Sequence, residues 1–217
     1  MTSLDHPRLS GLGRNPAAPQ DVLVRLAAHA VGRHGISLRR GRLADAVVEA
    51  LLTHGDKETA VSLHGERLSP AMRRKVAEHP DPAIRDAYPD FVRDMVDLGV
   101  PIGIADLEEV YGRPRTALAG APSPRLRAAV ARTWYDRPLA VQVGLLADPD
   151  RQVRAAATEH SQPGVPPEWR DRCLADPAVS VNVQLLSDAD PEVADDAAAN
   201  SALRPSSMYR ILTAAGL

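Results

Sequence analysis

A short helix-start motif recurs through the middle and the C-terminal part of the chain, and it constrains the fold more than any other feature. A serine or aspartate is followed three residues later by an apolar residue, and then usually by arginine. Serine and aspartate cap the free amide groups of a first helical turn, and proline is tolerated directly after the cap. Each copy therefore predicts the start of a short helix, at Ser69, Asp81, Ser123, Asp150, Asp176 and Asp190.

The copy around Asp150 shows why such helices are expected to pack against one another. Val153, Ala156 and Ala157 fall on one side of its helix and form a narrow strip of small apolar residues. A short helix with such a strip buries too little surface alone, so repeated copies must stack. The intervals from Ser123 to Asp150 and from Asp150 to Asp176 are 27 and 26 residues, although the other intervals differ. The sequence thus predicts an all-α array with an irregular repeat.

A two-proline turn near the N-terminus carries a family resemblance. Asn15-Pro16-Ala17-Ala18-Pro19 is followed by Val22-Leu23 and Leu26, which is an Asn-Pro-x-x-Pro turn before Val-Leu-x-x-Leu. This pattern resembles the bacterial leucine-rich repeat variant, a relative of HEAT-like α-solenoids built from short α- and 3₁₀-helices. The resemblance implies an irregular right-handed α-solenoid that forms a single domain over residues 15–217. Residues 1–14, rich in Gly, Pro, Ser and Arg, are expected to be a flexible lead-in.

Two predictions concern the segment after the two-proline turn. The first amphipathic helix is expected to end near Gly32, and the basic, glycine-punctuated stretch from Val31 to Gly41 is expected to be a loop. A helix is predicted from Leu43 to His54, because its apolar residues recur at intervals of three and four.

Charge and composition restrict the possible classes of protein. The 26 basic and 28 acidic residues give a net charge of −2, which provides no general attraction to nucleic acid or anionic membranes. No window approaches the roughly 20 apolar residues that a membrane-spanning helix needs. The single Cys173 excludes an intramolecular disulfide. A cytoplasmic protein without a membrane partner is therefore the expectation.

Arginines are the first candidates for a binding site. Arg33, Arg39, Arg40 and Arg42 lie in a stretch from residue 22 to 44 that contains no acid, so they are candidates for ligand contact, with a solvated surface as the alternative. The arginines of the helix-start motif, at 73, 85, 127 and 154, could form a row facing an acidic partner. Alternatively, Arg85 and Arg154 could form local ion pairs with Asp81 and Asp150, four residues earlier, and repeat solenoids often use such pairs to join adjacent units.

Three groups of residues are candidates for metal binding or catalysis. Glu78-His79 and Glu159-His160 resemble the paired ligands of HEAT-like di-iron hydroxylases, but in reversed order and at helix ends, where polar residues are common. Cys173 follows Trp169 by four residues and is expected to pack beside it as a core thiol. The cluster Trp134-Tyr135-Asp136-Arg137 has the residue types of an alkylpurine DNA glycosylase, although its tryptophan is more often part of a core. No metal site, cofactor or catalytic residue is predicted.

The sequence therefore favours a non-catalytic protein–protein interaction module or scaffold, whose partner is another protein. The alternative is a HEAT-like nucleic-acid-binding protein or an enzyme similar to alkylpurine DNA glycosylases. Two acidic segments, Asp81–Glu109 and Asp171–Asp196, complement the basic stretch before residue 44 and also suggest self-association.

Overall fold

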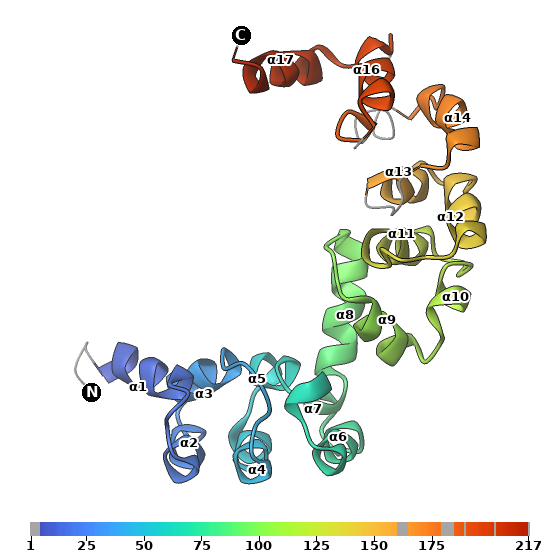
Figure 1. Cartoon of the computed structure of the whole chain (residues 1–217). Coiled ribbons are helices and arrows are strands. Elements are labelled where there is room, and N and C mark those ends of the chain that lie inside the picture. Colours follow the sequence, from blue (N-terminus) through green and yellow to red (C-terminus); the bar gives the residue numbers. More distant parts are fainter. Residues whose placement is uncertain (1–4, 160–164, 179–184, 189, 202, 217) are drawn as a thin grey trace. The chain divides into compact units, whose positions relative to one another are not determined.

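The computed structural model describes residues 5–159, 165–178, 185–188, 190–201 and 203–216 (Figure 1). In these ranges every regular element is an α-helix or a 3₁₀-helix, so the all-α prediction is confirmed. Among the described helices, none combines the length and the apolar character that crossing a bilayer requires. Contacts divide the chain into two compact units, residues 1–93 and 94–217, whereas the sequence had suggested a single domain over 15–217.

The N-terminal unit is built from two rows of short helices that alternate along the chain (Figure 1). Each helix contacts the next helix of its own row. One row contains α1 (Asp5–Arg14), α3 (Ala30–Ser37), α5 (Lys57–Val61) and α7 (Pro82–Arg85), and the other contains α2 (Gln20–Leu26), α4 (Asp45–His54) and α6 (Pro70–Ala77). A 3₁₀-helix, η1 (Gly65–Arg67), precedes α6, and α8 (Ala87–Leu98) crosses the boundary between the units. The apolar core of this unit extends from Leu23 to Ala87.

The C-terminal unit also consists of short helices. Its most extensive helix pair is α11 (Pro124–Thr133) with α13 (Arg151–Glu159), and α12 (Leu139–Leu146) packs against α13 (Figure 1). The remaining elements are α9 (Ile104–Tyr111), α10 (Arg115–Leu118), η2 (Pro167–Trp169), α14 (Arg170–Leu174), α16 (Pro191–Ala199) and α17 (Pro205–Ala214). Its core runs from Ala128 to Ala197 and includes Val153, Ala156 and Ala157, the strip expected to be buried.

Five of the six predicted helix starts are confirmed, and the helix expected after Asp176 lies largely outside the described residues. Ser69, Asp81, Ser123 and Asp190 accept hydrogen bonds from backbone N–H groups in the first turns of α6, α7, α11 and α16. Asp150 accepts from the N–H of Gln152 at 2.7 Å, and Asp176 from the N–H of Ala178 at 2.7 Å.

Two predictions near the N-terminus are wrong. Residues 5–14 form helix α1 in place of a flexible lead-in, and Ala30–Ser37 form helix α3 in place of a loop, so Gly32 lies inside a helix and α2 already ends at Leu26. The glycines explain both errors, because they allow close helix contacts and do not make turns. A Cβ atom at Gly35 would lie 2.4 Å from the carbonyl oxygen of Ser10, and one at Gly13 would lie 2.7 Å from the carbonyl carbon of Gly35. The backbones of α1 and α3 therefore contact each other at Gly13 and Gly35, where no side chain separates them.

Candidate functional site

Two arginines of the helix-start motif join successive repeats of the C-terminal unit. Arg127 donates from Nε and Nη2 to the two carboxylate oxygens of Asp148 at 2.7 and 2.8 Å. Arg154 makes the same bidentate contact with Asp176, at 2.5 and 3.1 Å. In each case Nη1 also donates to the carbonyl groups that lie six and five residues earlier. Each arginine thus connects its own helix to the segment around a later copy of the motif, and neither guanidinium is free for a ligand.

The charge states of both partners fit a permanent ion pair. Burial raises the pKa of Asp148, but hydrogen bonds from Arg127 and from the N–H of Asp150 outweigh it and hold that pKa below its usual value. Asp176 is affected in the same way, with Arg154 and the N–H of Ala178 as donors. The hydrogen bonds to Asp148 in turn raise the pKa of Arg127. Both sides therefore stay charged at neutral pH.

The four arginines that were predicted as a binding site separate into two kinds. Arg33 donates to the carbonyl of Ala27 at 3.1 Å and to Asp56 at 3.2 Å, which repeats the Arg127 arrangement in the N-terminal unit. Arg39 donates to the carbonyl groups of Gly13, Asn15 and Pro16 and so fastens the end of α1. Arg40 and Arg42 are exposed, and within the described ranges no hydrogen bond or ion pair engages them. Only these two of the four remain available to a ligand.

Two residues of the glycosylase-like cluster, Trp134 and Arg137, are buried in the fold. Trp134 is 6 % exposed and Arg137 is 5 % exposed. Arg137 donates to the carbonyl groups of Ala131, Trp134 and Ala157 and to the side chain of Gln142, so it ties together the C-terminal ends of α11 and α13. Burial lowers the pKa of Arg137 to about 10. Neither the indole nor the guanidinium can reach a nucleic-acid base from these positions.

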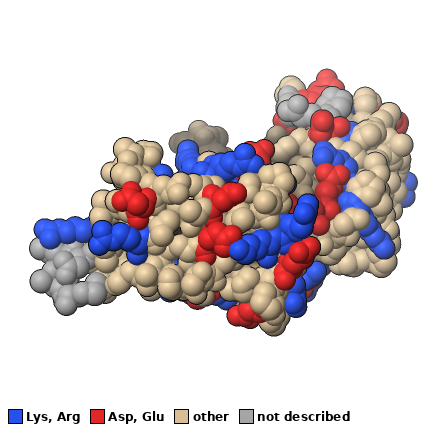
Figure 2. All heavy atoms as spheres, turned by 90° about the horizontal axis from the view of Figure 1, so that it is seen from below, with Lys and Arg blue, Asp and Glu red and all other residues tan. Residues whose placement is uncertain are grey.

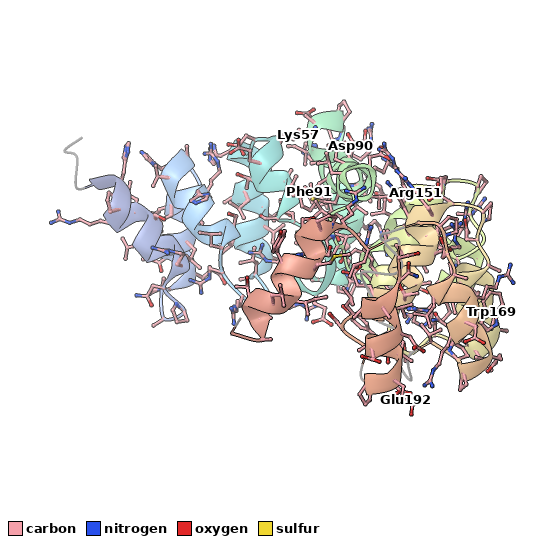
Figure 3. All side chains as sticks on the ribbon, turned by 90° about the horizontal axis from the view of Figure 1, so that it is seen from above. Lys57, Asp90, Phe91, Arg151, Trp169 and Glu192 are labelled. Atoms are coloured by element: carbon pink, nitrogen blue, oxygen red, sulfur yellow. The ribbon has the colours of Figure 1, made fainter. Side chains whose placement is uncertain are left out.

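His79 and Cys173, the other candidates for metal binding or catalysis, also have contacts within the fold. His79 follows the end of α6 and accepts a hydrogen bond from the N–H of Asp81 at 3.2 Å, while His160 lies outside the described residues. Cys173 is buried in the apolar core of the C-terminal unit, and Trp169 packs against this core, as predicted. Burial raises the pKa of the Cys173 thiol to about 11. Trp169, labelled in Figure 3, also lies 4.6 Å from the guanidinium of Arg172. In the part of the chain that the structure describes, no three His, Cys, Asp or Glu residues are arranged to hold a metal ion.

A groove in the C-terminal unit is a candidate binding surface. It lies between the end of α8, α11 and α13 and has a volume of about 370 Å³, within the range of ligand-binding clefts, about 300–1,000 Å³. Arg125, Ala128 and Arg132 line it from α11, and Gln152, Ala155, Ala156 and Glu159 from α13. Positions 125, 128 and 132 lie on one face of α11, and adding 27 to each gives 152, 155 and 159 on α13. The two helices thus present equivalent faces side by side.

The groove surface is mainly polar, with alanines of both helices at its base. Ala128 and Ala156 are 2 and 1 % exposed, whereas Leu98 at the end of α8 is 71 % exposed. Arg125 donates to the carbonyl of Asp97 at 2.6 Å. Arg132 donates to the carbonyl of Gly99 at 3.4 Å, and its Nε lies 3.9 Å from Glu159. The two arginines thus hold the α8 end against α11, while both signs of charge stay at the surface.

Sequence reasoning missed this groove, although the signal was present. The signal is the 27-residue interval between Ser123 and Asp150, which equals the offset between the groove-lining residues of α11 and α13. The exposed Leu98 carries no sequence mark, because its exposure depends on how α8 ends. Charge did not reveal the groove either: Figure 2 shows basic and acidic side chains interspersed on the face that it displays.

Comparisons with known proteins give no match: no family model, no curated protein and no solved structure corresponds to this chain. The resemblance to the bacterial leucine-rich repeat variant therefore stays a prediction.

Proposed function

We propose that this protein is a non-catalytic interaction module that binds a segment of another protein in the groove between α8, α11 and α13. We further propose that its helices form an irregular right-handed α-solenoid, in which equivalent faces of successive helices make the binding surface. The observation that carries the proposal is the in-register pair of helix faces, with an alanine floor beside the exposed Leu98. Small floor residues let a partner's larger side chains approach the backbone, while charged edges select its orientation.

A groove substitution tests the proposal. Ala155→Arg fills the floor with a long charged side chain, and Ala140→Arg places the same side chain on an exposed position of α12 outside the groove. Proteins captured by the immobilised wild-type chain from its native extract are purified and titrated against the three forms. Binding at least ten-fold weaker to Ala155→Arg and unchanged for Ala140→Arg supports the groove. A captured protein that binds Ala155→Arg as well as wild type would place the interaction elsewhere.

The alternative function, nucleic-acid binding, depends on Arg40 and Arg42, which are exposed on either side of Gly41. An electrophoretic shift with duplex DNA at low salt tests it. A shift that disappears in the Arg40→Ala, Arg42→Ala double variant would favour this alternative over the protein-binding groove. No shift would leave the groove as the working site.

A further inference from the structure

A small pocket in the N-terminal unit is lined by α1, α2 and the cap of α3, three helices that lie next to one another in Figure 1. Its volume is about 300 Å³, at the lower end of the range for ligand-binding pockets, about 300–1,000 Å³. Leu9, Val22 and Leu26 supply its apolar lining. Leu26 belongs to the apolar core of the unit, and Leu9 and Val22 are partly buried against that core. The pocket therefore offers a small apolar interior to a ligand.

His29 provides a hydrogen-bond donor at this pocket. Its Nδ1 accepts a hydrogen bond from the N–H of Val31 at 3.2 Å and so caps α3. A neutral imidazole that accepts at Nδ1 carries its hydrogen on Nε2. Among the described residues no group accepts a hydrogen bond from this Nε2, so it remains a donor for a ligand.

The same cap argues against a metal ion held by His29 and His6, whose rings are 6.0 Å apart. A metal ion on Nε2 of His29 would leave the ring hydrogen on Nδ1. That hydrogen would face the N–H of Val31, and the cap of α3 would be lost. The pocket edge is therefore suited to an acceptor and not to a cation.

Arg25 adds a positive charge at the same pocket. It lines the pocket from α2, is exposed, and within the described ranges makes no hydrogen bond or ion pair. Residues 6–44 contain seven arginines and one acid, Asp21, which is exposed one helical turn before Arg25 and forms no ion pair with it. Of the seven, Arg33 is paired with the carboxylate of Asp56. The remaining excess makes the potential around the pocket positive, so the pocket favours an anion over a neutral or cationic ligand of the same shape.

We propose that this pocket binds a small aliphatic carboxylate. The hydrocarbon chain fills the space between Leu9, Val22 and Leu26, and the carboxylate accepts hydrogen bonds from Arg25 and from Nε2 of His29. A carboxylate suits this pair because its two oxygens accept one bond from each donor, and the charge of Arg25 strengthens its own bond. The site goes beyond the proposed function, because it lies in the N-terminal unit and uses no residue of the α8–α11–α13 groove.

Amide NMR of the full-length chain, titrated with octanoate, tests this site. Octanoate is expected to bind with a dissociation constant on the order of 1 mM, since a ligand with so few non-hydrogen atoms reaches only modest affinity. The largest shifts are expected for the amides of Leu9, Val22, Leu26 and His29. Octanamide is the matched ligand, because it has the same chain and the same number of non-hydrogen atoms but no charge. It is expected to bind at least about three-fold more weakly.

Two variants separate the carboxylate contacts from apolar contact. Arg25→Gln removes the charge from an exposed position, and His29→Ser keeps a side-chain cap for α3 but removes the ring donor. Both are expected to weaken octanoate binding at least about three-fold, and Arg25→Gln is expected to remove the preference for octanoate over octanamide. Arg40→Gln makes the same change of charge at an exposed arginine outside the pocket, so octanoate binding should stay within about two-fold of wild type. The dispersion of the amide signals checks that each variant is folded.

Four results would overturn the inference. If no amide signal shifts up to about 10 mM octanoate, the pocket does not bind this class of ligand. Shifts confined to α17 would place octanoate on the exposed apolar side chains of that helix. Equal affinity for octanoate and octanamide, or octanoate binding unchanged by Arg25→Gln, would show that the carboxylate contact is wrong. None of these results bears on the groove, which Ala155→Arg tests, so failure of this site and failure of the proposed function are distinguishable.

Discussion

The arginines of this chain show how one residue type takes different positions in a repeat. Arg127 and Arg154 each bind an aspartate 21 or 22 residues further on, Arg137 binds only carbonyl and amide oxygens, and Arg73 is exposed. The predicted pairing of Arg154 with Asp150, four residues earlier, is wrong, because its guanidinium points to the next repeat. Local spacing cannot identify such partners, since the distance along the chain depends on the length of the intervening helix and loop.

Removal of Arg127 should be costly. In the Arg127→Ala variant Asp148, which is 8 % exposed, keeps its charge without its bidentate partner. The free energy of unfolding is expected to fall by about 2–4 kcal/mol. Arg73→Ala is the control, because Arg73 holds the same motif position but is exposed, and a loss of less than about 0.5 kcal/mol is expected. Urea unfolding measures both, and equal losses in the two variants would contradict a structural role for the Arg127 contact.

The same ion pairs predict how stability depends on pH. The folded-state pKa values of Asp148 and Asp176 lie below the usual value, so both carboxylates bind protons more readily in the unfolded chain. Their contribution is complete above about pH 4 and is lost as pH falls through the folded-state pKa values. The unfolding free energy should therefore decrease on acidification below about pH 4. An Asp148→Asn, Asp176→Asn double variant should show a shallower decrease, and an unchanged slope would refute this origin.

At the scale of helices, the sequence was informative where side chains act on their own helix. The caps at Ser69 and Asp190 need only the first turn, and the helix predicted from Leu43 to His54 is α4, which begins at Asp45 and ends at His54. Helices α1 and α3 were missed because their glycines serve a contact between two helices. A contact of this kind becomes visible only when both helices are placed, and a single sequence does not place them.

Two glycine substitutions distinguish helix packing from helix propensity. A Cβ atom at Gly35 would meet the backbone of Ser10 at 2.4 and 3.0 Å, and backbone cannot move aside, so Gly35→Ala should destabilise the protein by about 1–3 kcal/mol. Gly11 lies in α1 with nothing within 4 Å of the added atom. Gly11→Ala should therefore stabilise by up to about 1 kcal/mol. Chemical denaturation measures the change in the free energy of unfolding for both variants. A Gly35→Ala variant more stable than wild type would show that α1 and α3 are not in this close contact.

For the whole molecule, the contact pattern matters more than any one side chain. Most helix contacts join elements that are near in the sequence, and the contacts separate into residues 1–93 and 94–217. A chain of neighbouring contacts loses stability locally, because a defect weakens its own repeat and the adjacent ones before it affects distant ones.

This locality gives a prediction for hydrogen exchange of the full-length chain. Gly35→Ala disturbs the α1–α3 contact, so amide exchange should accelerate mainly within residues 1–93. Arg127→Ala disturbs the contact with Asp148, so exchange should accelerate mainly within residues 94–217. Mass spectrometry of peptides from both variants, measured against wild type at neutral pH, separates the two regions. If either variant accelerated exchange equally along the whole chain, the protein would unfold as one cooperative body. The two units would then differ in their contacts but would not unfold independently.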